Sequence, residues 1–225
     1  MKTFSPDTYG DIPLGVECAL PRQYLLQAME KKNFFHWAYK AILIAAFSLG
    51  AWHVGYATYI YAKAELAQVL IARAWERTLK GEQQVKPWSW ADTWPVARLK
   101  VPGTNIDLYI LAGASGRTIA FGPGHMSGTP LPGASGNSVI GGHRDTHLAF
   151  LRDLAPGQDL VVQRPDGSTI AYRVQGSKVV HKSDLSVIAS DGDTSLTLIT
   201  CYPFDALRAG GAERYVVSAR SIPSG

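Results

Sequence analysis

The amino-acid sequence predicts an all-β domain, either a closed barrel or a sandwich, preceded by an N-terminal transmembrane helix and a stalk helix. From Pro95 onward, short runs rich in β-branched residues are separated by Gly and Pro, which is typical of strands joined by turns. No helical pattern of comparable length alternates with these runs, so a doubly wound parallel sheet is disfavoured. Residues 41–62 contain no Lys, Arg, Asp or Glu and are long enough to cross a bilayer as a helix.

Composition narrows the classes of protein that the chain can represent. Its 225 residues suffice for one domain with accessory segments, and 46% hydrophobic against 18% charged residues excludes a predominantly disordered chain. The net charge of +4 comes from scattered Lys and Arg, without a basic stripe interleaved with aromatic residues. Nucleic acid is therefore not an expected partner.

The first two segments are an N-terminal segment, residues 1–40, and a membrane span, residues 41–62. The N-terminal segment mixes Pro, Gly and charged residues, with a short helix expected at Arg22 to Lys32. Aromatic residues flank the span at both ends, as in the interfacial belts of membrane proteins. The run Ala62–Ala64 matches a signal-peptidase site, but the forty preceding residues favour an uncleaved anchor. Lys and Arg are balanced on the two sides, so charge leaves the orientation open.

The third segment, residues 63–94, is expected to be a stalk helix and a Trp-rich linker. Helix formers run from Ala64 to Lys80, and Gly81 follows as a C-cap. We expect a loose apolar stripe on this helix from Leu66, Val69, Leu70, Arg73 and Trp75. Three tryptophans of the linker admit two interpretations, an interfacial anchor or a collar packed on the following domain: Trp88, Trp90 and Trp94.

The fourth segment, residues 95–225, carries the strands. Seven runs alternate or continue in the manner of strands: VARLKV, IDLYILA, GNSVIGGH, QDLVVQR, TIAYRVQGSKVVH, LTLITC and RYVVSARSI. Seven or eight strands fit into this segment, which favours a closed barrel or a sandwich.

The chain has two cysteines, Cys18 and Cys201. The span separates them, so they cannot form a disulfide across a bilayer. Cys201 ends the strand-like run TLITC and is followed by Tyr202 and Pro203. Because Pro cannot continue a central ladder, we expect the strand to open there and the thiol to reach a cleft. The alternative is a buried structural cysteine.

Two further residues suit nucleophilic chemistry at such a thiol. His143 follows a predicted strand and two glycines in GGHRD, and an imidazole can exchange a proton with a reacting thiol at neutral pH. Arg214 opens the last strand-like run thirteen residues after Cys201, beyond a Gly-rich loop, so a hairpin would return it beside the thiol. Its guanidinium always carries a positive charge and can stabilise an oxyanion.

A metal site is a weaker interpretation of the histidines. The spacing of His125, His143 and His147 on irregular segments fits no standard zinc pattern, and no carboxylate cluster accompanies them. We expect no metal and no cofactor.

The three motifs together resemble the sortase family. GPGH at 122–125, the stretch from Thr129 to Val162 that includes GGHRD, and TLITCYPF at 197–204 follow the family pattern over most of residues 95–220. The long GHRDTH and TCYPF forms resemble most the sortases of Gram-negative bacteria. The resemblance implies a closed eight-stranded sortase-type β-barrel over residues 95–225.

The resemblance also implies an activity, that of a sortase-type cysteine transpeptidase and endopeptidase of the hydrolase class. Cys201 would attack a C-terminal LPxTG-like sorting signal, His143 would protonate the leaving amine, and Arg214 would hold the oxyanion. The thioacyl-enzyme would then pass the protein to an amine acceptor or to water. Thr200 would contact the substrate through its hydroxyl or backbone, although a β-branched residue there also suits a plain strand former.

The resemblance places the catalytic domain outside the cytoplasm, on a single-pass anchor in the cell (inner) membrane, with residues 1–40 cytoplasmic. The expected partners are a substrate protein, an amine acceptor and the lipid bilayer. Another cysteine hydrolase or an L,D-transpeptidase is disfavoured because the SxGC run is absent. A non-enzymatic alternative is a membrane-tethered β-barrel binding module in which Cys201 is structural.

Overall fold

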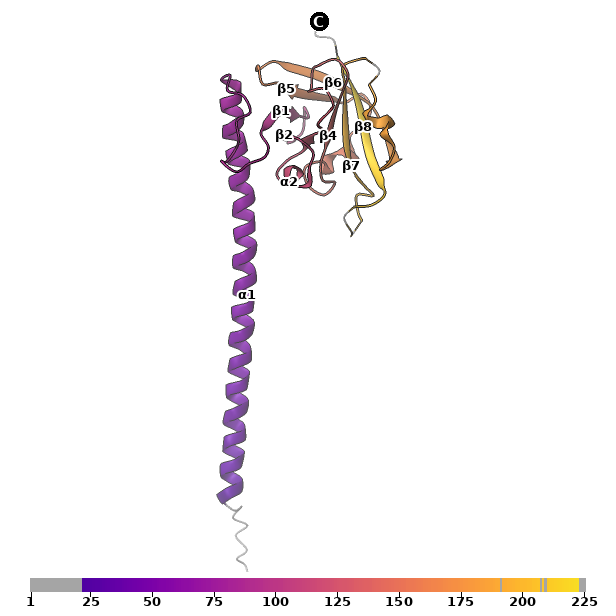
Figure 1. Ribbon diagram of the computed structural model, residues 1–225. Helices are drawn as coiled ribbons and strands as arrows, with labels where there is room; N and C mark the ends of the chain where they lie inside the picture. Colours follow the sequence, from indigo (N-terminus) through magenta and orange to yellow (C-terminus); the bar gives the residue numbers. More distant parts are fainter. Residues whose placement is uncertain (1–21, 191, 207, 209, 223–225) are drawn as a thin grey trace, which may run out of the picture. The chain divides into compact units, whose positions relative to one another are not determined.

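The computed structural model describes residues 22–190, 192–206, 208 and 210–222, in two units that are treated separately, residues 22–59 and residues 60–222. Cys18 and the rest of residues 1–21 lie outside the described residues. Helices and strands follow in the order α1 (Arg22–Leu79), β1 (Pro95–Lys100), β2 (Asp107–Ala112), α2 (Gly116–Ile119), β3 (Gly124–His125), β4 (Asn137–Gly141), η1 (Ala149–Asp153), β5 (Asp159–Gln163), β6 (Thr169–His181), η2 (Leu185–Ile188), β7 (Ser195–Tyr202) and β8 (Glu213–Ser221). Figure 1 labels the two α-helices and most of the strands.

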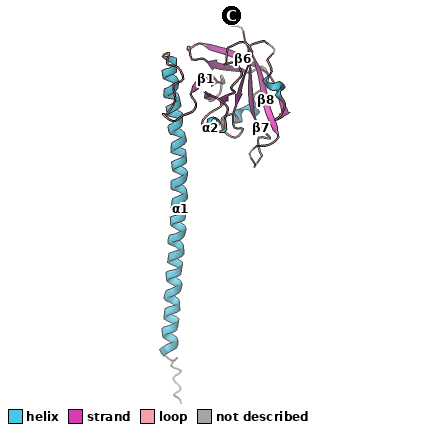
Figure 2. Ribbon diagram, viewed as in Figure 1, coloured by secondary structure: helices cyan, strands magenta, loops and turns pink. Residues whose placement is uncertain are grey.

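The strands close into a barrel in the order β1-β2-β3-β4-β7-β8-β6-β5. Most neighbours are antiparallel, but β2 pairs with β3, and β4 with β7, in parallel. The predicted eight-stranded closed barrel is thus confirmed for the part of the chain that the structure describes (Figure 2). Strand β7 lies between β4 and β8, so both of its edges are paired.

Alternating residues of the strands fill the barrel. The core consists of buried aliphatic side chains from most of the strands together with Tyr172, and Leu148 and Leu151 from the segment after β4 join it. The hydroxyl of Tyr172 accepts a hydrogen bond from the backbone N–H of Gly133 at 2.7 Å, so the one polar atom of this large core side chain has a partner.

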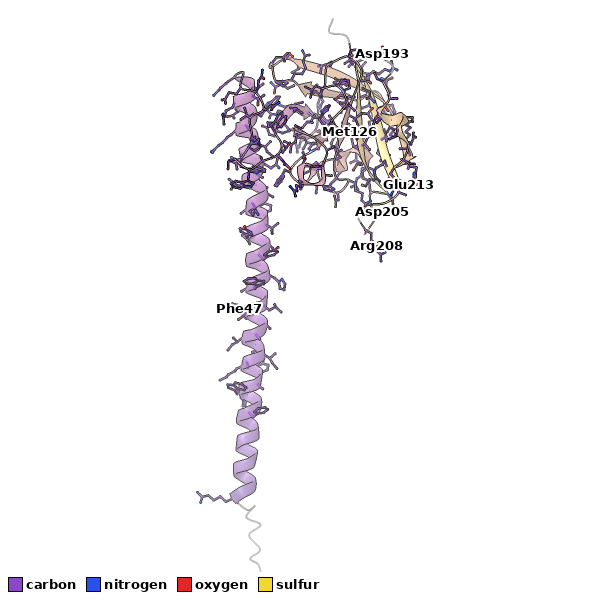
Figure 3. All side chains as sticks on the ribbon, in the orientation of Figure 1. Phe47, Met126, Asp193, Asp205, Arg208 and Glu213 are labelled. Atoms are coloured by element: carbon purple, nitrogen blue, oxygen red, sulfur yellow. The ribbon has the colours of Figure 1, made fainter. Side chains whose placement is uncertain are left out.

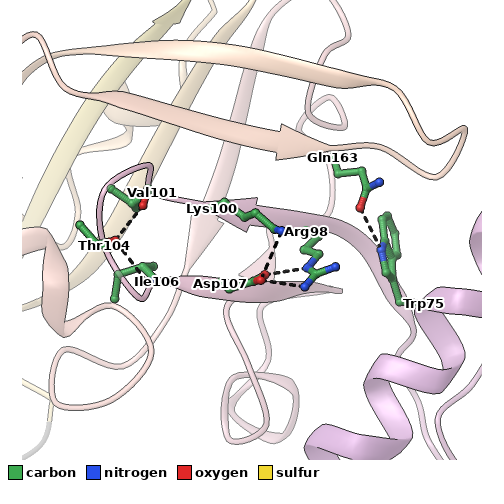
Figure 4. Close-up of polar contacts among 8 residues, drawn as sticks. All are labelled: Trp75, Arg98, Lys100, Val101, Thr104, Ile106, Asp107 and Gln163. Carbon is green, nitrogen blue, oxygen red and sulfur yellow. Dashed lines mark hydrogen bonds and ion pairs between the residues drawn. The ribbon is translucent and has the colours of Figure 1, made fainter.

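Polar contacts hold the first hairpin of the barrel together and join the end of α1 to β5 (Figure 4). The indole N–H of Trp75 donates to the side-chain oxygen of Gln163 on β5 at 3.3 Å. Arg98 on β1 forms a bidentate pair with Asp107 on β2 at 2.6 and 2.7 Å. The hydrogen bonds from Arg98 lower the pKa of Asp107, whereas burial raises it. The hydrogen bonds have the larger effect, so the pKa of Asp107 is lowered.

The stripe that α1 buries differs from the predicted one. The buried side chains are spaced at about one helical turn along one face: Ala67, Ile71, Ala74, Trp75 and Thr78. Of the predicted stripe, Trp75 is buried, whereas Leu66 is 57% and Val69 47% exposed. The buried face is offset by one residue from the predicted one, so that Ala67, Ile71 and Ala74 are buried in place of residues 66, 70 and 73. The prediction weighted large apolar residues and therefore passed over the two alanines.

The predicted stalk and the predicted span belong to one helix. Helix α1 extends without interruption from Arg22 to Leu79, and Gly81 follows it with a φ of +96°, as expected of a C-cap. From His36 to Leu79 it is long and apolar enough to cross a membrane, by length and composition alone. The side chains of Phe47 and Trp52 within residues 22–59 are exposed.

Candidate active site

Strand β7 carries the thiol at its end. Its residues alternate between two faces: Leu196, Leu198 and Thr200 are at most 1% exposed and face the core, while Cys201 is half-buried on the other face. The strand ends at Tyr202, immediately before Pro203, where the sequence predicted that it opens. Cys201 is a free thiol at this end.

Arg214 lies directly opposite the thiol on the neighbouring strand. The antiparallel register of β7 and β8 pairs Cys201 with Arg214, and paired residues point to the same face of a sheet. The Nη1 group of Arg214 donates to the carbonyls of Gly211 and Glu213, both at 2.8 Å. These two bonds fix the guanidinium to the loop before β8 and to the first residue of β8, and its remaining N–H donors are on Nη2 and Nε.

His143 is brought to the same end of β7 by its neighbour Gly142. The backbone N–H of Gly142 donates to the carbonyl of Ile199 at 3.2 Å, and the hydroxyl of Thr200 donates to the carbonyl of Gly142 at 2.8 Å. The peptide that leads into His143 is therefore held beside the residue that precedes Cys201. The His143 side chain is exposed.

Close packing against Leu148 requires a glycine at position 142, immediately before His143. A Cβ at Gly142 would lie 2.9 Å from the Cγ of Leu148, a fully buried core residue. Since the N–H of Leu148 also donates to the carbonyl of His143 at 3.0 Å, the segment folds back closely over Gly142. A larger residue would push this turn, and His143 with it, away from β7.

The structure thus brings Cys201 on β7, Arg214 on β8 and His143 in the segment after β4 to one end of the barrel. Figure 3 places Asp205, Arg208 and Glu213 at this end, and Asp193, which precedes β7, at the opposite end. Thr200 lies on the core face, so its hydroxyl contacts Gly142. The predicted substrate contact of Thr200 stays a prediction.

Arg144, which the sequence interpretation left without a role, fixes the loop between β7 and β8. Its side chain is 6% exposed, and Nη2 donates to the carbonyls of Ala206 and Arg208 at 2.8 and 2.7 Å. Its Nη1 is buried without a hydrogen-bond partner among the described residues. Because both acceptors are backbone carbonyls more than sixty residues away, no local sequence signal indicated this contact.

His147 and His125, the other two histidines considered for a metal site, lie in different surroundings. Burial lowers the pKa of His147, and the charge of nearby His143 lowers it further, whereas Asp145 raises it. His125 is buried on β3, and its Nε2 lies 2.9 Å from the carbonyl oxygen of Pro130. Within the described residues, no group of three His, Cys, Asp or Glu side chains is arranged to hold a metal ion.

A groove of about 380 Å³ lies on the face of β7 and β8 that bears the thiol. Its lining includes Thr197 and Val216, and Val216 pairs with Ile199, two residues before Cys201. The segment between β6 and β7 forms one wall, because the Nδ2 of Asn137 donates to the carbonyls of Val187 and Ala189 at 3.0 and 3.2 Å.

Asn137 is a second residue that the sequence interpretation missed. Its Oδ1 accepts a hydrogen bond from the Thr197 hydroxyl at 2.8 Å, so one buried amide links β4, β7 and the segment that contains η2. A polar residue at the start of the run NSVIG was the only sequence signal, and it indicated no partner.

Within the described residues, the chain is thus a closed eight-stranded β-barrel with a free thiol at the end of a central strand. Residues 99–222 match the family model described as a sortase domain. The chain therefore belongs to the sortase family, whose members are known as cell-wall transpeptidases.

Individual relatives agree with this assignment. The chain is 30% identical over 125 residues to Sortase D of Bacillus subtilis (strain 168), a match that covers 55% of this chain and 62% of that relative. Sortase A from Corynebacterium diphtheriae is similar in structure, with a TM-score of 0.55 and 28% identity over 65% of this chain and 69% of that one. Sortase C1 of Streptococcus agalactiae gives a TM-score of 0.53 and 28% identity over 58% and 69% of the two chains.

Proposed function

We propose that the chain is a membrane-anchored cysteine transpeptidase that cleaves a C-terminal LPxTG-like sorting signal and transfers the protein to an amine. The observation that carries this proposal is the pairing of Cys201 with Arg214 across β7 and β8, with the peptide before His143 held against Thr200. Catalysis by Cys201, His143 and Arg214 requires a nucleophile, a proton carrier and a fixed cation within one small region.

The reaction has two halves. In the first, the Sγ of the Cys201 thiolate forms a bond to the carbonyl carbon of the signal's threonine, and Arg214 stabilises the oxyanion through its free Nη2 and Nε donors. The C–N bond then breaks as His143 gives a proton to the leaving amine, which leaves a thioester on Cys201. In the second half, an incoming amine or water attacks the thioester, His143 takes the proton, and the C–S bond breaks to regenerate the thiolate.

The groove on the face of β7 and β8 suits the part of the signal that precedes the scissile bond. Thr197 stands four residues before Cys201, about 13 Å along the strand at 3.3 Å per residue, which an extended tetrapeptide can span. With its threonine carbonyl at the thiol, such a peptide would run along this groove beneath the wall held by Asn137. The side chains of the groove would then select among sorting signals.

The anchor and the subclass belong to the same proposal. Residues 41–62 would cross the inner membrane once, with residues 1–40 in the cytoplasm, residues 63–94 as a connector and residues 95–225 outside. The exposure of Phe47 and Trp52 supports a lipid environment for the span. The GHRDTH and TCYPF forms support membership of the Gram-negative sortases.

The test uses the full chain in detergent and a library of LPxTG-like peptides. We expect an acyl adduct on Cys201, identified by mass after proteolysis, that disappears on addition of hydroxylamine or an amine acceptor. Peptides with the same composition in scrambled order are the control. If no peptide yields an adduct and the thiol is alkylated no faster than that of a model peptide, the chain is a binding module instead.

A further inference from the structure

A second groove lies far from the thiol in sequence, where the last turns of α1 meet the Trp-rich linker. Its volume is about 520 Å³, and its lining is mainly apolar, with Leu66 and Leu70 from α1, Trp88 and Trp90 from the linker, and Phe121 after α2. All of these residues belong to the unit formed by residues 60–222. No step of the proposed reaction uses this groove.

The walls of the groove are fixed to each other. The side-chain amide of Gln68 on α1 donates to the carbonyl of Phe121 at 2.7 Å. The rings of Trp88 and Phe121 meet edge to face, with 5.0 Å between their centroids. Since a hydrogen bond and an aromatic contact hold opposite sides, the groove is a preformed feature of the folded domain.

The rim of the groove is unusually apolar for a surface in contact with water. Trp90 is 84% exposed and Leu66 57% exposed, with the exposed Val69 beside them on α1. A contiguous exposed apolar surface indicates an interaction site, and Trp prefers the boundary between water and lipid. Two tryptophans of the linker thus differ in their surroundings. Trp94 packs against the barrel core, as expected of a collar, whereas Trp90 projects outward.

Helix α1 gives the distance along the chain between the groove and the end of the proposed span. At 1.5 Å per residue, Leu66 lies about 6 Å and Leu70 about 12 Å beyond Ala62 along the helix. Each headgroup layer of a bilayer is about 5–8 Å thick. Along α1, the groove therefore starts one residue after the proposed span, at Lys63, and continues to Leu70, slightly farther than one headgroup layer is thick.

The charged lining residues also favour an anionic lipid. Lys63 and Arg117 contribute two positive charges, and Asp92 contributes one negative charge. Arg117 is exposed at the rim, where a phosphate group would meet its guanidinium.

We propose that this groove binds a phospholipid of the bilayer, with the acyl chain against Leu66, Trp88 and Phe121 and the headgroup phosphate against Arg117. The lipid seats the catalytic unit on the membrane surface next to its own anchor. This inference rests on the anchor of the proposed function, and the experiment separates the two.

The experiment measures the depth of single fluorophores in vesicles that contain the full chain. Both native cysteines are first removed by Cys18→Ser and Cys201→Ala. An environment-sensitive dye is then attached to a single new cysteine, introduced by Trp90→Cys, Phe47→Cys or Val179→Cys. Position 179 is an exposed control site on β6. We expect a lipid with a spin label in its headgroup to quench the dye at position 90 at least about threefold more than at position 179, as a site at the headgroup level requires. A lipid with a spin label deep in its acyl chain should quench the dye at position 47.

The outcomes are separable. If the dye at position 47 is not quenched, the anchor is wrong and the lipid site falls with it. If position 47 is quenched but position 90 responds only to aqueous iodide, the anchor stands and the lipid site is overturned. If the dye at position 90 is protected from iodide only when a vesicle holds more than one chain, the groove binds a second copy. If that protection disappears on deletion of residues 1–21, the groove binds that segment. Either result overturns the proposal.

A second measurement avoids a label in the groove. Native mass spectrometry of the unlabelled chain counts retained phosphatidylglycerol, and Arg117→Gln with Trp90→Ser should lower the bound fraction at least about fivefold, the attraction of one basic residue to an anionic surface. The control, Lys182→Gln with Val179→Ser, removes the same charge and a smaller exposed apolar side chain elsewhere and should leave the bound fraction unchanged. Equal losses in both double variants would overturn the site.

Discussion

The two faces of strand β7 differ in what they contact, although their residues alternate along one segment. On the inner face, Leu198 packs in the core and Thr200 binds the carbonyl of Gly142. On the outer face, Cys201 pairs with Arg214, and Thr197 lines the groove. A slip of one residue would exchange the two faces. The register of β7 therefore sets both the stability of the barrel and the position of the thiol.

The largest expected effect comes from the outer face, with Cys201→Ala. The variant should form no acyl adduct, because no other group on this face supplies the nucleophile. Its free energy of unfolding should change by less than about 1 kcal/mol, since only one half-buried sulfur is removed. Intact mass after peptide addition and urea unfolding give the two values. A loss of several kcal/mol would mean that the thiol belongs to the core.

Arg214→Lys on the same face tests the fixed guanidinium. An ammonium keeps the charge but cannot bind Gly211 and Glu213 while presenting two further donors, so kcat/KM should fall about 10²- to 10³-fold. The control is Arg173→Lys on β6, whose guanidinium pairs with Asp159 at the surface. Rates of peptide cleavage should fall for Arg214→Lys and stay near those of the unchanged protein for Arg173→Lys. Equal rates would remove Arg214 from the reaction.

Leu198→Ala on the inner face should act on folding. Removing a fully buried leucine side chain lowers the free energy of unfolding by about 2–5 kcal/mol. Ile199→Ala, the half-buried neighbour on the outer face, should cost less. Urea unfolding of the two variants measures the contrast between the faces, and equal costs would contradict it.

Thr200→Val separates a positioning role from direct substrate contact. The substitution keeps the shape and removes the hydroxyl that holds Gly142, which should cost about 1 kcal/mol of stability and lower kcat with little change in KM. Thr200→Ser should restore kcat. A rise in KM at constant kcat would instead support the substrate contact predicted from the sequence.

Much of this arrangement was predictable because its signals are local. TLITC before Tyr202 and Pro203 indicated both a strand end and an accessible thiol, and short runs broken by Gly and Pro indicated a closed barrel or a sandwich. The resemblance to the sortase family then favoured the closed eight-stranded barrel. The two-residue strand β3 was too short to produce a pattern, and its pairing depends on Gly124, where a Cβ would lie 2.2 Å from the carbonyl oxygen of Gly113. That close approach is a tertiary fact without a local sequence signature.

The residues that were missed share one property, partners that are distant in the sequence. Asn137 and Arg144 act on backbone carbonyls fifty to sixty-four residues away, and any residue type can supply a carbonyl. The stripe on α1 was mispredicted for a related reason. Small residues such as Ala67 become core residues only when a barrel wall lies against them.

The Arg144 contact has a consequence for how this protein can vary. Because its guanidinium binds the main chain at Ala206 and Arg208, it constrains the path of the loop but not the identity of the side chains there. Positions 206 and 208 can thus accept substitutions while Arg144 keeps both of its carbonyl partners. Positions 206 and 208 are therefore suitable sites for randomisation in directed evolution toward other substrates or acceptors, provided that Arg144 is left unchanged.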